Sequence, residues 1–138
     1  MIAHSEWHGN GYFEGQSESG HCIDFDATPE HASAPSPMEV VLMGLCACTS
    51  VDVVTILEKK RQRLTGLRVT AKAERAAEPP RTFTAIKLTY TVSGDLDRKA
   101  VEDAVRLSKE KYCSVSRMLE KTAVIDYEIV YLGEESAS

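Results

Sequence analysis

Residues 36–63 read SPMEVVLMGLCACTSVDVVTILEKKRQR and predict one long helix that is apolar on every side through its first half. Ser36 is a favourable N-cap, Pro37 suits the first helical position, and Glu39 completes a capping box. A helix of this length spans about 40 Å, more than a domain of this size is expected to bury by itself. We therefore expect a partner chain to cover part of it.

The overall composition is that of one soluble domain over residues 1–138, with 43% hydrophobic and 27% charged residues. The uncharged run 40–51 is too short for a membrane span, and the N-terminal residues lack the basic region and apolar core of a signal peptide. We expect a cytoplasmic protein with no membrane contact. In that reducing compartment, four cysteines suggest thiol chemistry or metal binding rather than structural disulfides.

Charge is distributed unevenly along the chain. Residues 1–58 contain nine acidic residues and no Lys or Arg, whereas residues 59–138 hold all 16 Lys and Arg. The pI is near 5.4, and no basic patch is interleaved with aromatic residues. This pattern argues against nucleic acid as a partner.

The remaining elements follow from changes in hydrophobic period. A Thr65-Gly66 stop separates the long helix from a hairpin, and Asp95 or Asp97 can cap a second helix that ends near Cys113. We predict an α+β fold with helices on one face of a mostly antiparallel sheet. The expected strands are 2–8, 12–17, 21–26, 67–74, 83–92 and 123–132, with a short third helix at 114–121 and a polar tail at 133–138.

The four cysteines differ in their sequence surroundings. A reactive thiol needs a positive neighbour or a helix N-terminus, because only the thiolate is a nucleophile. Ser114 can cap the third helix, which would place Cys113 where the helix dipole favours a thiolate. Cys48 lies three turns into its helix with Asp52 one turn further on, and a carboxylate there would raise its pKa. The residues alone therefore favour Cys113 as the reactive thiol, while cysteines in an all-apolar helix, such as Cys46 and Cys48, are more often core residues than catalytic ones.

The order of these pieces resembles the OsmC/Ohr family of thiol-dependent peroxidases over nearly the whole chain. Three N-terminal strands lead to a Ser-Pro-x-Glu start of the long helix, whose centre holds small residues and then Cys48. Two strands, a helix ending in Tyr112-Cys113-Ser114-Val115, and a final strand follow. The sequence PMEVVLMGLCACTSVDVV is most similar to that of the OsmC-like, YhfA-type branch of the family.

This resemblance implies an OsmC-like fold and an intertwined homodimer whose active sites lie at the subunit interface. It assigns Cys48 as the peroxidatic cysteine and Cys113 as the resolving cysteine, and it gives Met38 and Glu39 substrate-binding positions. The implied activity is reduction of organic hydroperoxides or other peroxides in oxidative stress defence. A sulfenic acid on Cys48 would be resolved by Cys113 and the disulfide reduced by an external dithiol, with no metal and no other cofactor.

Two positions depart from the pattern of the organic hydroperoxide reductases. Those proteins use an Arg from the N-terminal region to activate the thiolate, and this chain has no Arg before Arg61. They also place Glu directly after the Pro at the start of the helix, where this chain has Met38. A positive charge near Cys48 would have to come from a His, from Arg117 or from the partner subunit.

Two other interpretations stay open at this level. A metal site could be drawn from His4 and His8 with His21, Cys22 or His31, although finger-type ligand spacing is absent from the sequence. Alternatively, the protein has weak or no peroxidase activity, and Met38, Met43 and Met118 enclose a pocket for an apolar or lipid-like ligand at the dimer interface.

Overall fold

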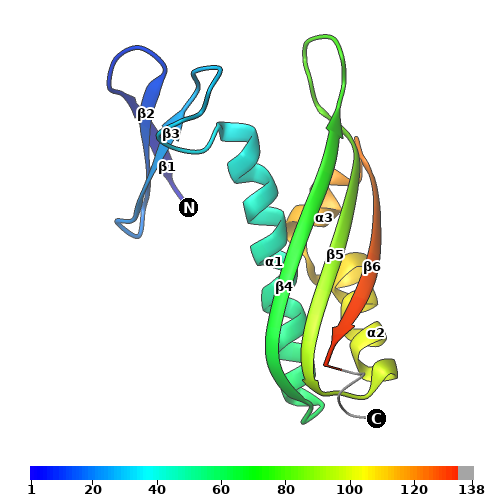
Figure 1. Cartoon of the computed structure of the whole chain (residues 1–138). Coiled ribbons are helices and arrows are strands. Elements are labelled where there is room, and N and C mark those ends of the chain that lie inside the picture. The colour runs from blue at the N-terminus through cyan, green and yellow to red at the C-terminus, as the bar shows by residue number, and fades with distance from the viewer. Residues whose placement is uncertain (134–138) are drawn as a thin grey trace. The chain divides into compact units, whose positions relative to one another are not determined.

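The computed structural model describes residues 1–133, so only Gly133 of the predicted polar tail lies inside the described residues. The chain divides into two compact units, Met1–Leu42 and a second that begins at Met43. The boundary falls inside the long helix, and each unit has its own three-stranded sheet (Figure 1).

The first unit is an antiparallel sheet in the order β1-β2-β3, as the sequence predicts to within a residue at each end. Phe13 is paired with Trp7 on one side and with Phe25 on the other, so one face of this sheet is apolar. Of residues 1–42, all of which are described, only Asp26 is buried, and Trp7 is 66% exposed. The strands are β1 (Ala3–Trp7), β2 (Tyr12–Ser17) and β3 (Cys22–Asp26).

Asp26 ties down the loop that leads to the long helix. Its carboxylate accepts hydrogen bonds from the backbone N–H of Thr28 at 2.8 Å and from the backbone N–H and hydroxyl of Ser33 at 3.2 and 3.0 Å. These bonds, led by the Thr28 hydroxyl, hold the pKa of Asp26 well below its usual range, against the opposing effect of burial. The carboxylate is therefore the centre of the turn before the helix.

The long helix α1 covers Pro37–Lys59, and its predicted capping box is confirmed. The Ser36 backbone N–H donates to Glu39 at 2.9 Å, and the Glu39 N–H donates to the Ser36 hydroxyl at 3.2 Å. The predicted end at Arg63 is wrong. Arg61 adopts a φ of 57°, and the N–H of Gln62 bonds to the carbonyl of Leu57 at 2.9 Å, the six-to-one bond of a Schellman motif that ends the helix early.

The second sheet has the order β4-β5-β6, from β4 (Arg63–Arg75), β5 (Phe83–Asp95) and β6 (Val124–Leu132). The predicted hairpin β4–β5 is antiparallel, whereas β5 and β6 are parallel because a helical crossover lies between them. The expected stop at Thr65-Gly66 is wrong, since Gly66 lies inside β4 beside Ser93 at a register shift. A Cβ on Gly66 would come within 2.6 Å of the Ser93 hydroxyl, so Gly permits this close pairing.

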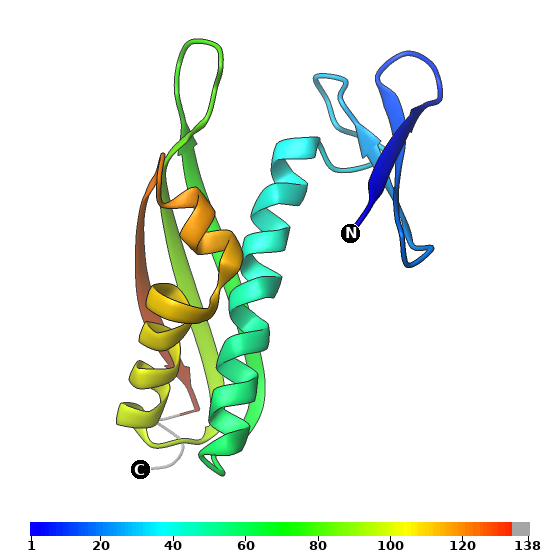
Figure 2. The same ribbon diagram turned by 180° about the vertical axis from the view of Figure 1, so that it is seen from behind.

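The crossover consists of α2 (Arg98–Leu107), the π-helical turn η1 (Ser108–Tyr112) and α3 (Ser114–Leu119). Asp97 occupies the N-cap position of α2, but its side chain makes no capping bond. Figure 2 shows these helices and the later part of α1 on the same face of the second sheet. The core between them is built mainly from β5 and from one stripe each of α1 and α2: Leu45, Val53, Leu57, Phe83, Ile86, Leu88, Tyr90, Val92, Ala100, Val101, Ala104 and Val105.

Most of α1 is not covered. Its buried residues form a single stripe with four-residue spacing: Leu45, Thr49, Val53 and Leu57. Helix α1 as a whole, unlike its uncharged run 40–51, is long and apolar enough to cross a membrane by length and composition. This is weak evidence for a membrane span, because the core helix of a soluble protein passes the same test.

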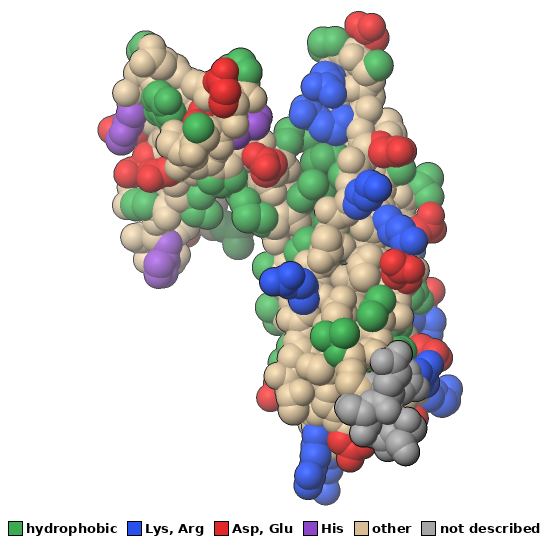
Figure 3. All heavy atoms as spheres, in the orientation of Figure 1, with side chains coloured by type: hydrophobic (Ala, Val, Ile, Leu, Met, Phe, Trp, Pro, Cys, Tyr) green, Lys and Arg blue, Asp and Glu red, His purple; other side chains and the backbone are tan. Residues whose placement is uncertain are grey.

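The uneven charge is visible on the surface. In the view of Figure 3, His side chains gather on the first unit, whereas Lys and Arg lie on the second. Hydrophobic side chains remain at the surface of both units.

Candidate functional site

Two cysteines from different helices meet in the second unit. Cys48 lies in the middle of α1 and is half-buried, and Cys113 is fully buried at the N-cap of α3. The two thiols lie close enough that Cys48 helps to raise the pKa of the Cys113 thiol, and both cysteines are free. The fold thus brings together the two cysteines that the family resemblance singles out, although they lie far apart in the sequence.

The turn at Cys113 is held by its own backbone and by Ser116. The Cys113 N–H donates to the Ser108 carbonyl at 2.8 Å, which closes the π-helical turn η1. The Ser116 N–H donates to the Cys113 sulfur at 3.4 Å, so the cysteine itself is the cap of α3. The predicted cap at Ser114 is wrong, because Ser114 is already the first helical residue.

Burial reverses the sequence-based ranking of the thiols. It raises the pKa of the Cys113 thiol, and the adjacent Cys48 thiol adds to this effect, while the Ser116 N–H opposes it. Cys113 is therefore a protonated, enclosed thiol at neutral pH, which corrects the expectation that its helix N-terminus makes it the reactive one. Cys48 is the more accessible member of the pair.

The other two cysteines lie in different surroundings. Cys46 is half-buried, and burial raises the pKa of its thiol. Cys22 is exposed on β3 of the first unit. Both are free, so they serve as internal comparisons for the Cys48 and Cys113 pair.

A chain of buried hydroxyl groups joins α1, β5 and η1, and the sequence alone does not predict it. Thr49 is 2.7 Å from both the Tyr90 hydroxyl and the Ser108 hydroxyl, and Ser108 donates to the Asp52 carboxylate at 2.8 Å. Asp52 is thus turned toward Ser108. One signal was available, since Thr49 is a polar residue in an otherwise apolar, buried stripe of α1.

Met38 and Glu39 belong to the first unit. Met38 is half-buried, and Glu39 is an exposed member of the capping box. The Ser36 backbone and hydroxyl bonds lower the pKa of Glu39 below its ordinary value. Glu39 therefore has a helix-capping role that stands independently of any contact with substrate.

The cations considered for activating Cys48 have local partners. Arg117 makes an ion pair with Glu120 at 2.8 Å, and His8 lies 3.3 Å from Glu6. The Nδ1 atom of His31 is 2.8 Å from the Asp26 carbonyl. Within residues 1–133, no group of three or more His, Cys, Asp or Glu could hold a metal ion.

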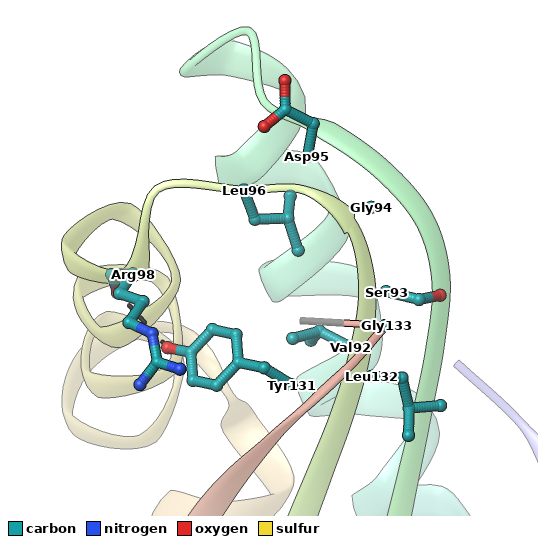
Figure 4. Close-up of a pocket in the computed structure, with 9 residues that line it drawn as sticks. All are labelled: Val92, Ser93, Gly94, Asp95, Leu96, Arg98, Tyr131, Leu132 and Gly133. Atoms are coloured by element: carbon teal, nitrogen blue, oxygen red, sulfur yellow. Dashed lines mark hydrogen bonds between the residues drawn. The ribbon is translucent and has the colours of Figure 1, made fainter. Parts of the chain in front are cut away.

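Two pockets of the second unit bear on where a ligand could bind. One of about 600 Å³ is formed at the end of the second sheet, where the Arg98 guanidinium lies 4.4 Å from the centre of the Tyr131 ring (Figure 4). Another of about 340 Å³ between α1 and the crossover has Asp52, Lys59 and Tyr112 among its lining residues. Neither is lined by a cysteine.

A long apolar helix thus brings a half-buried cysteine close to a buried one on one face of a three-stranded sheet. Residues 30–128, which include both cysteines, match the sequence model of the OsmC-like protein family. The chain belongs to the OsmC family.

Individual relatives extend the match to almost the whole chain. The protein is 47% identical to protein YhfA of Escherichia coli K12, a match that covers 94% of this chain and 98% of YhfA. The crystal structure of an OsmC-like protein from Mycoplasma pneumoniae is similar with a TM-score of 0.83 at 16% identity, covering 94% of this chain and 95% of that one. The organic hydroperoxide resistance protein OhrB of Bacillus subtilis is similar with a TM-score of 0.63 at 20% identity, covering 94% and 98%.

Proposed function

We propose that this protein is a thiol-dependent peroxidase that reduces organic hydroperoxides or other peroxides through Cys48 and Cys113. The observation that carries the proposal is the close approach of the two side chains, which is evident in the effect of the Cys48 thiol on the pKa of Cys113. Close approach is the first requirement for a disulfide, since the Cα atoms of the two cysteines must lie within about 7 Å of each other. The fold is shared with proteins named for organic hydroperoxide resistance, which supports a proposal of peroxidase activity.

The proposed cycle balances with one peroxide and one dithiol. The Cys48 thiolate attacks an oxygen of the peroxide, so a sulfur–oxygen bond forms, the oxygen–oxygen bond breaks, and the leaving alkoxide takes a proton to become an alcohol. The Cys113 sulfur then displaces water from the Cys48 sulfenic acid and closes a disulfide. An external dithiol reduces that disulfide by exchange and is itself oxidised.

The unequal exposure of the two cysteines fits these roles. Peroxide can approach the half-buried Cys48, whereas Cys113 is enclosed and its pKa is raised by burial. A protonated, buried resolving thiol is protected from direct oxidation until Cys48 has reacted. Met38 and Glu39 are proposed substrate-binding residues on the basis of the family resemblance.

We also propose that the whole chain acts as one OsmC-like domain within an intertwined homodimer. The first unit has an apolar sheet face but no buried hydrophobic side chain among its described residues, and a three-stranded sheet needs such a face covered. On α1, Met43 is 50% exposed and Val51 is 65% exposed. A second copy of the chain would cover both surfaces at once. Sedimentation equilibrium would test this, and a monomer at micromolar concentration would contradict it.

The decisive experiment for the activity compares three purified proteins with an organic hydroperoxide and a dithiol. Wild-type protein and Cys22→Ser should consume the hydroperoxide at the same rate, because Cys22 is exposed in the other unit. Cys48→Ser should show only the background rate of the dithiol alone. Equal consumption by Cys48→Ser and wild type would exclude the proposed role of Cys48.

The alternative function is binding of an apolar or lipid-like ligand with weak or no peroxidase activity. It is favoured by the exposed methionines Met43 and Met118, since Met side chains adapt to irregular apolar ligands. Organic extraction of the purified protein followed by mass spectrometry would reveal a stoichiometric ligand. A ligand-free protein that consumes hydroperoxide would exclude this alternative.

A further inference from the structure

The π-helical turn η1 connects α2 to the resolving cysteine. It begins at Ser108, which is fully buried, and ends at Tyr112, directly before Cys113. A π-helical turn inserts an extra residue into a helix and changes the direction of the residues that follow, and such turns occur often at functional sites. The position of the Cys113 sulfur therefore depends on how this turn is anchored.

Ser108 anchors the turn from both its backbone and its side chain. Its carbonyl accepts the Cys113 N–H at 2.8 Å. Its hydroxyl lies 2.7 Å from the Thr49 hydroxyl and donates to Asp52 at 2.8 Å. Thr49 is the neighbour of Cys48 in α1, so one residue links the backbone of one cysteine to the helix that carries the other.

Asp52, at one end of the hydroxyl chain, determines the direction of all its hydrogen bonds. The Asp52 carboxylate only accepts, so the single proton of the Ser108 hydroxyl is used there. Thr49 must then donate to Ser108, and Tyr90 must donate to Thr49. Within residues 1–133 every buried side-chain nitrogen or oxygen has a partner, so the chain is fully satisfied. A satisfied buried network of this kind favours one arrangement of the elements that it joins.

We propose that Ser108 is the positioning residue that holds Cys113 against Cys48, with Asp52 as its anchor on α1. This inference rests on the proposed function, in which the two cysteines form a disulfide. Tyr90 belongs to the same hydroxyl chain but lies at its far end, and none of its hydrogen bonds involves Ser108 or Cys113. Loss of the Ser108 or Asp52 side chain should therefore loosen the cysteine pair, whereas loss of the Tyr90 hydroxyl should not.

The test measures the disulfide equilibrium in glutathione redox buffers, which needs no peroxide. Oxidised glutathione takes two electrons from the Cys48 and Cys113 thiols, giving the protein disulfide and two molecules of reduced glutathione. Ser108→Ala and Asp52→Ala should each lower the equilibrium constant by about tenfold, since a site held 1 Å too loosely loses its function. The double variant should fall no further than either single variant, because both remove the same anchor. Peptide mapping identifies the bonded cysteines.

Tyr90→Phe is the matched control, because it also removes one buried hydroxyl from the network. Its equilibrium constant should stay within about twofold of the wild-type value, as expected for a change that leaves the Ser108 anchor in place. An equal fall of the equilibrium constant in Tyr90→Phe and Ser108→Ala would show only a general loss of stability and would overturn the inference. An unchanged equilibrium constant in Ser108→Ala would also overturn it. Absence of any Cys48–Cys113 disulfide in the wild type would also overturn it, while the hydroperoxide assay with Cys48→Ser would still decide the proposed activity separately.

Discussion

The buried thiol of Cys113 lies beside the half-buried thiol of Cys48, which helps to raise its pKa, so the cap of one helix approaches the middle of another. This contact orders the chemistry that the pair can perform. In the proposed cycle, a small oxidant reacts with the half-buried Cys48, and the enclosed Cys113 reacts only with the sulfenic acid that forms on Cys48. The account therefore predicts different consequences for loss of each cysteine.

Cys113→Ser should leave the first step intact and block the second. Hydroperoxide should still oxidise Cys48, but the sulfenic acid would persist because no resolving thiol is present. Trapping with dimedone followed by mass spectrometry should show several-fold more Cys48 adduct than in wild type, an estimate based on the loss of the competing thiol. Cys46→Ser is the control, and a similar gain of adduct in that variant would contradict the role given to Cys113.

Ser36→Ala tests the helix cap separately from the redox site. Removing the Ser36 hydroxyl breaks half of the capping box and should lower the free energy of unfolding by about 1 kcal/mol. Ser114→Ala is a matched control, since Ser114 is exposed and the cap of its helix is Cys113. Ser114→Ala should change the free energy of unfolding by no more than about 0.5 kcal/mol. Urea unfolding of both variants would check the difference, and equal losses would contradict the assigned caps.

Tyr90 should make the protein less stable at alkaline pH. Burial raises the pKa of Tyr90 to about 12. The folded state thus binds the phenol proton more tightly than the unfolded state does. The contribution of this proton to the free energy of unfolding is complete below about pH 10. It is lost as the pH rises toward 12, at about 1.4 kcal/mol per pH unit. Tyr90→Phe should cost stability at pH 8, and the difference from wild type should shrink above pH 10. Urea unfolding at several pH values measures this, and a constant difference would contradict it.

Asp26 should make the first unit sensitive to acid. Its hydrogen bonds to Thr28 and Ser33 lower its pKa, so the stability that it confers is present above the ordinary pKa of Asp and is lost as the pH falls through the lowered value. Asp26→Asn should therefore raise the exchange rate of backbone amides in residues 27–35 at neutral pH. Asp24→Asn, which changes an exposed carboxylate on the same strand, should leave those rates unchanged. Equal exchange in the two variants would contradict this role.

Regular elements could be predicted from the sequence because their signals are local. The capping box of α1 and the alternation of Ile86, Leu88 and Tyr90 on β5 each depend on residues close in the chain. The end of α1 could not be predicted from the sequence, because it is set by the positive φ of Arg61, and Arg rarely adopts this conformation. The parallel pairing of β6 likewise depends on where the crossover returns the chain.

The functional site was only partly predictable for the same reason. Family resemblance pointed to Cys48 and Cys113, but their relative reactivity depends on burial, which a sequence does not give. The hydroxyl chain joins Thr49, Tyr90 and Ser108 from three separate elements, so its bonds exist only in the folded chain. Asp52 was expected to act on Cys48 through helical spacing, and instead its carboxylate accepts from Ser108.

The most direct test of the central claim is to count thiols after reduced protein reacts with one equivalent of an organic hydroperoxide. The account predicts loss of two thiols per chain and a peptide map with a single disulfide between Cys48 and Cys113. Unchanged thiols, or a disulfide that joins other cysteines, would contradict it.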